Sequence, residues 1–362
     1  MAESLERLKK EKVMKTTLEE LAAAREVMLA DGATGTNLFK AGLETGYPPE
    51  LWNVERADTI TALYQEFVDA GSDVILTNSF GGTSFRLKLH ASETRVHELN
   101  LAAARLARQV ADKADRPVLV AGSIGPTGEL FSPLGMLTPE AAEAAFTEQA
   151  EALAQGGVDI IWIETMSALE EVRAATIAAQ KTGLPVMATM TFDTAGRSMM
   201  GIKPTDYKDF AAEIGLQGFG ANCGIGPAEL IDSISHFDAL NQSSFVIAKG
   251  NCGIPAYIDG EIHYHGTPEL MAEYALIARD LGARIIGGCC GTSSEHLQAM
   301  RTALDTTPKG SPPPAEDIAN RLGIAWRDLA DARSSDARSS DARSSDASEG
   351  RVRRRRRTAK TR

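Results

Sequence analysis

Cysteine is scarce in this chain of 362 residues, which contains only four. So few thiols cannot build a disulfide scaffold, and we expect a reducing, cytoplasmic setting in which they stay free to bind metal. Long apolar runs are also missing. No stretch reaches the roughly 18 apolar residues that a transmembrane helix needs, and the charged N-terminus lacks the apolar core of a signal peptide. The composition therefore argues against a disulfide-rich secreted domain and against a membrane protein.

Basic residues are few outside the C-terminal tail. The whole chain has 38 Lys and Arg against 49 Asp and Glu, a formal net charge of −11. Residues 351–362 hold seven arginines and one lysine but no acid, so residues 1–350 carry 30 bases against 49 acids, a net charge of −19. An acidic body of this kind argues against nucleic acid as a specific partner.

Short apolar runs alternate eight times with helical stretches of about ten to twenty residues. The predicted strands are Val27–Asp31, Asp73–Thr77, Pro117–Gly122, Asp159–Glu164, Pro185–Met190, Gly218–Cys223, Ser244–Lys249 and Ala283–Gly288. The helices that follow them are expected near 58–70, 93–112, 139–155, 168–182, 205–215, 227–238, 267–281 and 293–304. Runs that are apolar on both faces are typical of parallel sheets covered by helices. Eight such units predict an α/β fold, the (β/α)8 TIM barrel, rather than an open doubly wound sheet, and no GxGxxG follows the first strand.

Helix-start signals support this register. Two pairs fit the capping box, and three dipeptides place proline at the first helical position. The pairs are Ser167 with Glu170 and Thr292 with Glu295, and the dipeptides are Thr138-Pro139, Gly226-Pro227 and Thr267-Pro268.

The ends of the chain differ in composition from the predicted barrel, which spans 27–305. Residues 1–26 are rich in Lys and Glu and predict a helical extension that caps one end of the barrel. Residues 306–330 form a Pro/Gly/Ser linker and a short helix. Residues 331–362 contain three copies of Asp-Ala-Arg-Ser-Ser and the arginine run, and we expect this low-complexity tail to be disordered because it has almost no apolar surface to bury.

Three of the four cysteines lie where predicted strands end. Cys223 ends the sixth strand, and Cys289 and Cys290 follow the eighth. The carboxyl ends of barrel strands meet at one face, where the chemistry of such folds takes place, so the thiols should lie together there with Asp31 and Glu164. For the adjacent pair alone, packing, a strained vicinal disulfide and metal binding remain open, and the third thiol favours metal.

The remaining cysteine and two of the histidines have simpler interpretations. Cys252 is expected to act as a small buried hydrophobe, although a place near the mouth of the barrel without metal binding is also open. His263 and His265 flank a tyrosine in a polar stretch whose spacing fits neither a HExxH helix nor a zinc finger, so we expect them in a loop.

Five ordered motifs resemble the homocysteine S-methyltransferase family over about residues 25–305. The motifs are Asp31-Gly32-Ala33-Thr34-Gly35-Thr36, Thr77-Asn78-Ser79-Phe80, Ile163-Glu164-Thr165, Gly220-Ala221-Asn222-Cys223 and Gly287-Gly288-Cys289-Cys290-Gly291-Thr292. The resemblance implies a zinc-dependent barrel that methylates the sulfur of homocysteine to give methionine. It also implies that Cys223, Cys289 and Cys290 hold one zinc ion per chain.

The resemblance extends to the substrate. It implies that Asp31 and Glu164 bind the ammonium group of homocysteine, and that Asn251 can occupy the fourth zinc position when substrate is absent. Backbone amides around Gly32 and Ala33 are expected to take the substrate carboxylate, because a glycine lets the main chain approach closely. For the two acids, a helix cap or an ordinary ion pair at the mouth of the barrel remains the alternative.

A zinc site built from thiolates suits this reaction. Free thiols ionise near pKa 8.5, so few are thiolates at neutral pH, whereas coordination to a divalent cation deprotonates them. Three protein ligands at about 2.3 Å leave a fourth zinc position open for the substrate sulfur. The bound sulfur is then expected to attack an electrophilic methyl group in line.

The methyl donor is predicted from differences within the family. Betaine-using relatives carry aromatic residues where this chain has Gly81 and Thr165, and the chain looks more like the homocysteine-binding domain of cobalamin-dependent methionine synthase. We therefore expect methylcobalamin carried by a separate protein. Trp52 matches a betaine-site tryptophan, which keeps betaine open as the donor, and S-methylmethionine is a further alternative. A barrel scaffold or binding protein with a structural zinc is the alternative of another class, and the sequence assigns no oligomeric state.

Overall fold

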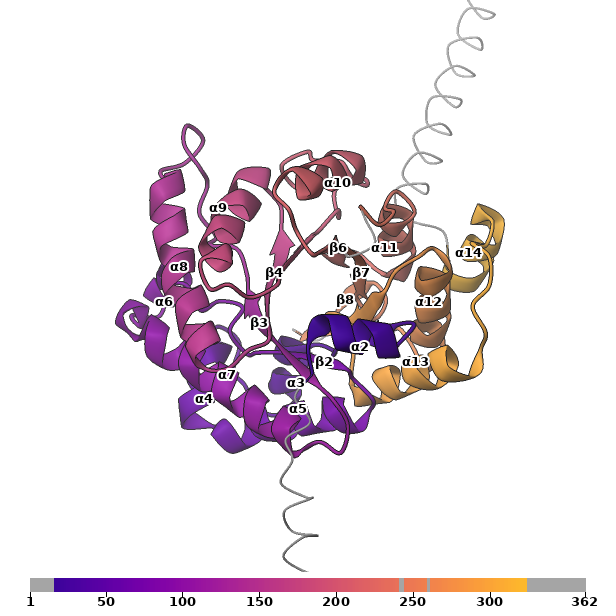
Figure 1. Ribbon diagram of the computed structural model, residues 1–362, viewed down its shortest axis with the longest axis horizontal. Coiled ribbons are helices and arrows are strands. Elements are labelled where there is room, and N and C mark those ends of the chain that lie inside the picture. The colour runs from indigo at the N-terminus through magenta and orange to yellow at the C-terminus, as the bar shows by residue number, and fades with distance from the viewer. Residues whose placement is uncertain (1–15, 241–243, 259–260, 324–362) are drawn as a thin grey trace, which may run out of the picture.

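Eight parallel strands form a barrel in the computed structural model, which describes residues 16–240, 244–258 and 261–323 (Figure 1). The strands are β1 (Met28–Leu29), β2 (Val74–Leu76), β3 (Leu119–Ile124), β4 (Ile160–Met166), β5 (Val186–Met190), β6 (Gly218–Cys223), β7 (Phe245–Gly250) and β10 (Ile285–Gly288). Their order around the sheet is β1-β10-β7-β6-β5-β4-β3-β2. A parallel bridge between Ala30 and Val74 links the first strand to the second, so the sheet closes on itself. The predicted TIM barrel is confirmed.

Helices surround the strands (Figure 1). The main ones are α5 (Ala57–Asp69), α7 (Val96–Lys113), α8 (Pro139–Gln155), α9 (Leu169–Gln180), α10 (Pro204–Glu213), α11 (Pro227–Ile234), α12 (Pro268–Asp280) and α13 (Ser294–Thr306). Shorter elements in the connections are α3 (Thr34–Lys40), η1 (Pro49–Leu51), α4 (Trp52–Glu55), α6 (Ser84–Lys88) and η2 (Glu93–Arg95). Two further helices, α2 (Leu18–Ala24) and α14 (Ala315–Leu322), flank the barrel in sequence. Among the described residues, no helix is long and apolar enough to cross a membrane.

Side chains alternate between the two faces of each strand, as the pleat requires. One set packs inside the barrel: Met28, Ala30, Val74, Leu76, Leu119, Ala121, Ile160, Trp162, Met187, Phe245, Ile247 and Ile285. The other set, which includes Leu29, Ile75, Ile161 and Val246, packs against the surrounding helices. The interior is therefore a filled core, and open space for chemistry is left at the ends of the strands.

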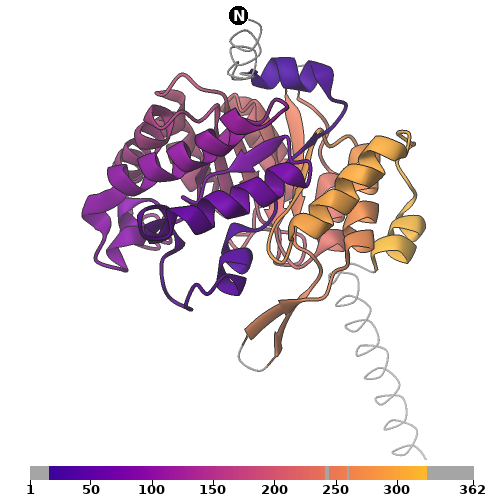
Figure 2. The same cartoon turned by 90° about the horizontal axis from the view of Figure 1, so that it is seen from below.

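Helix α2 lies across the amino-terminal end of the barrel (Figures 1 and 2). Leu18 and Leu21 of this helix belong to the interior cluster of the barrel. The helix begins at a capping box in which the Glu20 amide donates to the Thr17 hydroxyl at 3.2 Å and the Thr17 amide donates to the Glu20 carboxylate at 3.0 Å. Residues 1–15 of the expected N-terminal extension and residues 324–362, with the repeats and the arginine run, lie outside the described residues.

The helix-start signals were right at the prolines and wrong at the capping boxes. Thr138, Gly226 and Thr267 each precede a helix that begins with proline. Helix α9 instead begins one residue later than predicted, after Ala168, and has no side-chain cap. Helix α13 is capped by Ser293 with His296, again one residue later. At α13 the reason is visible, because the carbonyl of the buried Thr292 accepts from the amide of Ala33 at 3.1 Å and is held in the loop.

An antiparallel hairpin, β8 (Pro255–Ile258) and β9 (Glu261–Tyr264), interrupts the connection between β7 and α12. It projects from the barrel at the end opposite to α2 (Figure 2). The expected loop around His263 is therefore wrong, because this residue lies in a strand, whereas His265 follows the strand. Both histidine side chains are exposed, and neither belongs to the cluster of possible metal ligands.

Candidate metal and substrate site

Three thiols meet at the carboxyl-terminal mouth of the barrel. Cys223 is the last residue of β6, and Cys289 and Cys290 follow β10. Their sulfur atoms all lie within 4.8 Å of one another, and each thiol is free and partly exposed. A tetrahedral zinc ion with bonds of about 2.3 Å places its sulfur ligands about 3.8 Å apart, so the arrangement fits such an ion with one position left open.

The backbone around the cysteines is held in conformations that aim the sulfurs at one point. Cys223 has a φ of 63°, in the left-handed region that few non-glycine residues adopt. Its neighbour Gly224 accepts a hydrogen bond from the side-chain amide of Asn251, whose oxygen accepts from the amide of Cys290 at 3.0 Å. Asn251 therefore ties the two cysteine loops together, and its predicted role as a fourth metal ligand stays a prediction.

Tyr264, at the end of the hairpin, was not predicted as part of the site. Its hydroxyl donates a hydrogen bond to the sulfur of Cys290, and burial together with that sulfur raises the pKa of Tyr264. Gly291 makes room for the ring, because a Cβ there would lie 2.4 Å from the Tyr264 side chain and the residue has a φ of 82°. The hairpin thus covers one side of the three thiols.

The three thiols cannot ionise independently. Hydrogen bonds from Cys223 and Cys289 favour a thiolate on Cys290 and lower its pKa. Hydrogen bonds with Cys289 and Cys290, together with burial, raise the pKa of Cys223. Three thiolates so close together repel one another, and a divalent cation among them removes that penalty.

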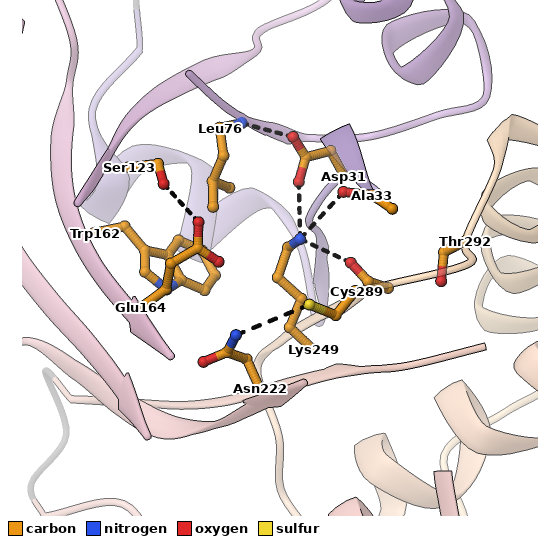
Figure 3. Close-up of polar contacts among 12 residues, drawn as sticks. Asp31, Ala33, Leu76, Ser123, Trp162, Glu164, Asn222, Lys249, Cys289 and Thr292 are labelled. Atoms are coloured by element: carbon orange, nitrogen blue, oxygen red, sulfur yellow. Dashed lines mark hydrogen bonds and ion pairs between the residues drawn. The ribbon is translucent and has the colours of Figure 1, made fainter. Parts of the chain in front are cut away.

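A layer of polar side chains lies directly above the apolar interior of the barrel. It consists of Ser123, Glu164, Asn222 and Lys249. Ser123, Glu164 and Lys249 follow the inward-facing Ala121, Trp162 and Ile247 by two residues, and Asn222 follows Gly220, which pairs with Ile247. The pleat therefore turns all four toward the barrel axis. Figure 3 shows these side chains facing one another beside Cys289.

Glu164 is the carboxylate of this layer. One of its oxygens accepts from the Ser123 hydroxyl at 2.5 Å. Burial raises the pKa of Glu164 to about 7 against the positive charge of Lys249, which lowers it, and the negative charge of Cys289 adds to the rise. The predicted placement of this residue at the mouth agrees with the structure, and its role in substrate binding stays a prediction.

Asp31 lies two residues beyond the end of β1 and is fully buried. One carboxylate oxygen accepts from the amide of Leu76 at 2.7 Å, and the other lies 3.3 Å from the ammonium of Lys249 (Figure 3). Burial raises the pKa of Asp31. An ion pair at the mouth, which was the alternative to substrate binding, is thus present in the structure.

The expected carboxylate site at Gly32 and Ala33 is partly engaged in other contacts. The amide of Ala33 donates to the carbonyl of Thr292 at 3.1 Å, and the carbonyl of Gly32 accepts from Lys249 at 3.2 Å. A Cβ at Gly32 would lie 2.7 Å from the Thr292 carbonyl oxygen, so this position needs a glycine for close packing. Carboxylate binding by these amides stays a prediction.

Lys249, Asn222 and Tyr264 are the residues that the sequence analysis did not assign. A period-two reading of the strand from Phe245 would have placed Lys249 inside the barrel, where a lysine is unusual. The same reading identifies Asn222, whereas the position of Tyr264 depends on the hairpin. Cys252 is buried, as the packing interpretation expects, and it lies outside the group of three thiols.

Comparison with known proteins places this site in a family. The homocysteine S-methyltransferase family model matches residues 28–304. Methionine synthase of Mycobacterium tuberculosis (strain ATCC 25618 / H37Rv) is 29% identical over 299 residues, covering 78% of this chain and 25% of the relative. Methionine synthase of Mycobacterium leprae (strain TN) is 28% identical over 311 residues, covering 81% of this chain and 26% of the relative. The chain thus spans about a quarter of the length of the curated relatives it matches.

Among solved structures, the fold is similar to that of the homocysteine methyltransferase MmuM from Escherichia coli. The metallated form has a TM-score of 0.66 at 22% identity, covering 79% of this chain and 99% of that chain. The oxidized form has a TM-score of 0.65 at the same identity, covering 80% and 99%. At this identity the likeness shows the fold alone, and the match to the family model carries the assignment. On that basis the chain belongs to the homocysteine S-methyltransferase family.

Proposed function

We propose that this protein is a zinc-dependent homocysteine S-methyltransferase that forms methionine. The observation that carries the proposal is the convergence of Cys223, Cys289 and Cys290 at the mouth of the barrel. The buried Glu164 carboxylate faces the same central space as Cys289 (Figure 3). Thiolate ligands and a nearby carboxylate fit a substrate that has a thiol at one end and an ammonium group at the other.

The three cysteines would hold one zinc ion through their sulfur atoms. When bound, zinc supplies a positive charge and an open position that favour the thiolate form of the substrate sulfur. Glu164, oriented by its 2.5 Å hydrogen bond from Ser123, would bind the substrate ammonium by a charge-assisted hydrogen bond. With both ends of the amino acid fixed, the sulfur is placed for in-line attack on a methyl group.

The proposed methyl donor is methylcobalamin carried by a separate protein, as expected from the sequence. A quaternary ammonium donor such as betaine needs an open aromatic cage. Trp52, which matches a betaine-site tryptophan, is only 6% exposed, and the Arg56 guanidinium lies 5.0 Å from its ring centroid. Gly81 leaves little room for an aromatic residue, because a Cβ there would lie 2.9 Å from the Glu50 carboxylate. These contacts support the corrinoid donor over betaine.

The test is methionine formation by the full chain with betaine, S-methylmethionine, S-adenosylmethionine or methylcobalamin, with zinc measured in the same sample. We expect about one zinc per chain, homocysteine-dependent methionine formation, and the highest rate with the corrinoid donor. A full rate with betaine or S-methylmethionine alone would overturn the donor assignment. Absence of zinc, or failure of every donor with a zinc-loaded chain, would overturn the proposed enzyme.

A further inference from the structure

Lys249 carries a charge into the interior of the barrel. The residue is only 3% exposed, and it follows the inward-facing Ile247 by two positions. An isolated ammonium at such a depth would be strongly destabilising, so its partners account for its presence. The ammonium lies 3.3 Å from Asp31 and donates to the carbonyls of Gly32 at 3.2 Å and Gly288 at 2.7 Å.

These three partners lie on two separate loops. Asp31 and Gly32 follow β1, and Gly288 ends β10 immediately before Cys289. Figure 3 shows the lysine nitrogen between the two loops, with dashed contacts to both. The side chain therefore connects the predicted substrate-binding loop to the cysteine loop.

Asp31 is enclosed by this arrangement and faces the ammonium of Lys249. It is 0% exposed, one oxygen accepts from the Leu76 amide, and the other faces Lys249. Among the described residues Lys249 is its salt-bridge partner, so the acid already has the cation that an amino-acid substrate would otherwise provide. A substrate ammonium at Asp31 would therefore have to share its carboxylate with Lys249.

Glu164 differs from Asp31 in its exposure and in its partners. It is 8% exposed, and within the described part of the chain its carboxylate has one hydrogen-bond partner, the Ser123 hydroxyl. The pleat turns it toward the same central space as Lys249, whose charge lowers the pKa of Glu164, but the carboxylate within ion-pair distance of Lys249 is that of Asp31. It is the acid at the mouth with capacity left for a further donor.

We propose that Lys249 is a positioning residue that neutralises Asp31 and ties its loop to the cysteine loop, leaving Glu164 as the carboxylate that binds the ammonium of the substrate. This inference rests on the proposed function, because it names which acid recognises homocysteine. It gives the two family acids different roles, with Asp31 acting through Lys249 and Glu164 contacting the substrate.

The first measurement tests the buried pair in the zinc-loaded full chain without substrate. Lys249→Met and Asp31→Asn should each lower the midpoint of thermal unfolding by about 5–10 °C, because each leaves a buried charge without its partner. The double variant Lys249→Met/Asp31→Asn should recover most of the loss, because both charges are gone. Additive losses in the double variant would refute the pairing.

The second measurement assigns the ammonium, using L-homocysteine and 4-mercaptobutanoate, which lacks the amino group. Calorimetric titration gives the ratio of their dissociation constants for each zinc-loaded variant. Glu164→Gln should reduce the preference for homocysteine about tenfold, because it removes a charge-assisted hydrogen bond. Lys249→Met/Asp31→Asn should keep the preference within about threefold of the wild type.

Glu171→Gln is the matched control for a buried glutamate. Its carboxylate accepts from the Thr127 amide at 2.8 Å and hydroxyl at 2.6 Å and contacts none of the cysteines, so the preference should not change. A loss of preference in the double variant, with Glu164→Gln unaffected, would show that Asp31 binds the ammonium and would overturn the assignment. If the wild-type chain binds neither thiol, the proposed function and the role of Glu164 fail together, while the unfolding measurement still decides the Lys249 pairing.

Discussion

Asn222 links the end of β4 to the end of β6, and replacing it with alanine tests how the mouth is held together. Its oxygen accepts from the Thr165 amide at 2.8 Å, and its nitrogen donates to the Thr165 hydroxyl at 2.7 Å. Thr165 follows Glu164 and has a φ of 62°, and Cys223 follows Asn222 and has a φ of 63°. Two strained residues beside the predicted substrate and metal groups thus depend on one buried side chain.

The expected loss follows from these contacts. Asn222→Ala removes two hydrogen bonds with Thr165, each contributing about 0.5–1.5 kcal/mol net, and a longer one of 3.9 Å from the Asn222 nitrogen to the Cys289 sulfur. It also leaves a poorly hydrated Thr165 amide without its acceptor. We therefore expect the free energy of unfolding to fall by about 2–4 kcal/mol. Without the hydrogen bonds of Asn222, the backbone of Thr165 and Cys223 can leave the left-handed conformation, which costs about 1–3 kcal/mol at each residue. This relaxation would move the Cys223 sulfur. Zinc affinity should fall as well.

The assay pairs urea unfolding with competition for zinc against a chromophoric chelator. Asn53→Ala is the matched control, because Asn53 is equally buried and its amide donates to the carbonyls of Asn78 at 2.8 Å and Leu99 at 3.3 Å, away from the cysteines. The control should lose similar stability and keep its zinc affinity. If Asn222→Ala keeps its stability, or loses stability but keeps its zinc affinity, Asn222 does not hold Cys223 in place for zinc.

Three further predictions concern other parts of the chain. Cys223→Ser should abolish stoichiometric zinc in metal analysis, whereas Cys252→Ser should retain it, because Cys252 is buried outside the thiol cluster. Burial raises the pKa of Glu164 to about 7 from its ordinary 4.5, so this residue's contribution to stability is present below about pH 4.5 and is lost as the pH rises through 7. Glu164→Gln should therefore become more stable relative to the wild type between about pH 5 and pH 8 in thermal unfolding, and a constant difference would contradict this. Leu21→Ala should cost about 2–4 kcal/mol in urea unfolding and leave zinc content unchanged, because Leu21 packs inside the opposite end of the barrel.

The strands were predictable because their burial leaves a strong pattern. Ile160 to Ile163 and Val186 to Met190 are apolar on both faces, and such runs form the parallel strands of a covered barrel. Strand β1 is shorter than predicted and ends at Leu29, although the bridge at Ala30 continues the pairing. The placement of Cys223, Cys289 and Cys290 followed from the fold, because strand ends in a barrel share one face.

The hairpin was missed although its signal was present. Between Pro255–Ile258 and Glu261–Tyr264 the sequence is Asp259-Gly260, a dipeptide typical of two-residue hairpin turns between strands. The residues on either side of this dipeptide do not alternate regularly between apolar and polar, so the two strands were not recognised in the sequence. The error mattered for the site, because the hairpin is what brings Tyr264 to Cys290.

The partners of the polar layer could not be predicted in the same way. The periodicity of a strand fixes the face on which Lys249 lies, but its contact with Gly288 depends on how two distant loops pack. The hydrogen bonds of Asn222 with Thr165 likewise join residues 57 positions apart. Such long-range contacts follow from the closed sheet and leave no local trace in the chain.

The closure of the barrel by α2 has a consequence for the order of events in the proposed reaction. Leu18 and Leu21 pack inside the amino-terminal end, whereas the thiols and Glu164 lie at the carboxyl-terminal ends of the strands. An amino acid and a bulky methyl donor would both have to reach the site through the carboxyl-terminal mouth, and a bound donor would block the path of the amino acid. Homocysteine would then have to enter first, and methionine could depart only after the spent donor had withdrawn, which gives a compulsory sequence that steady-state inhibition patterns would reveal.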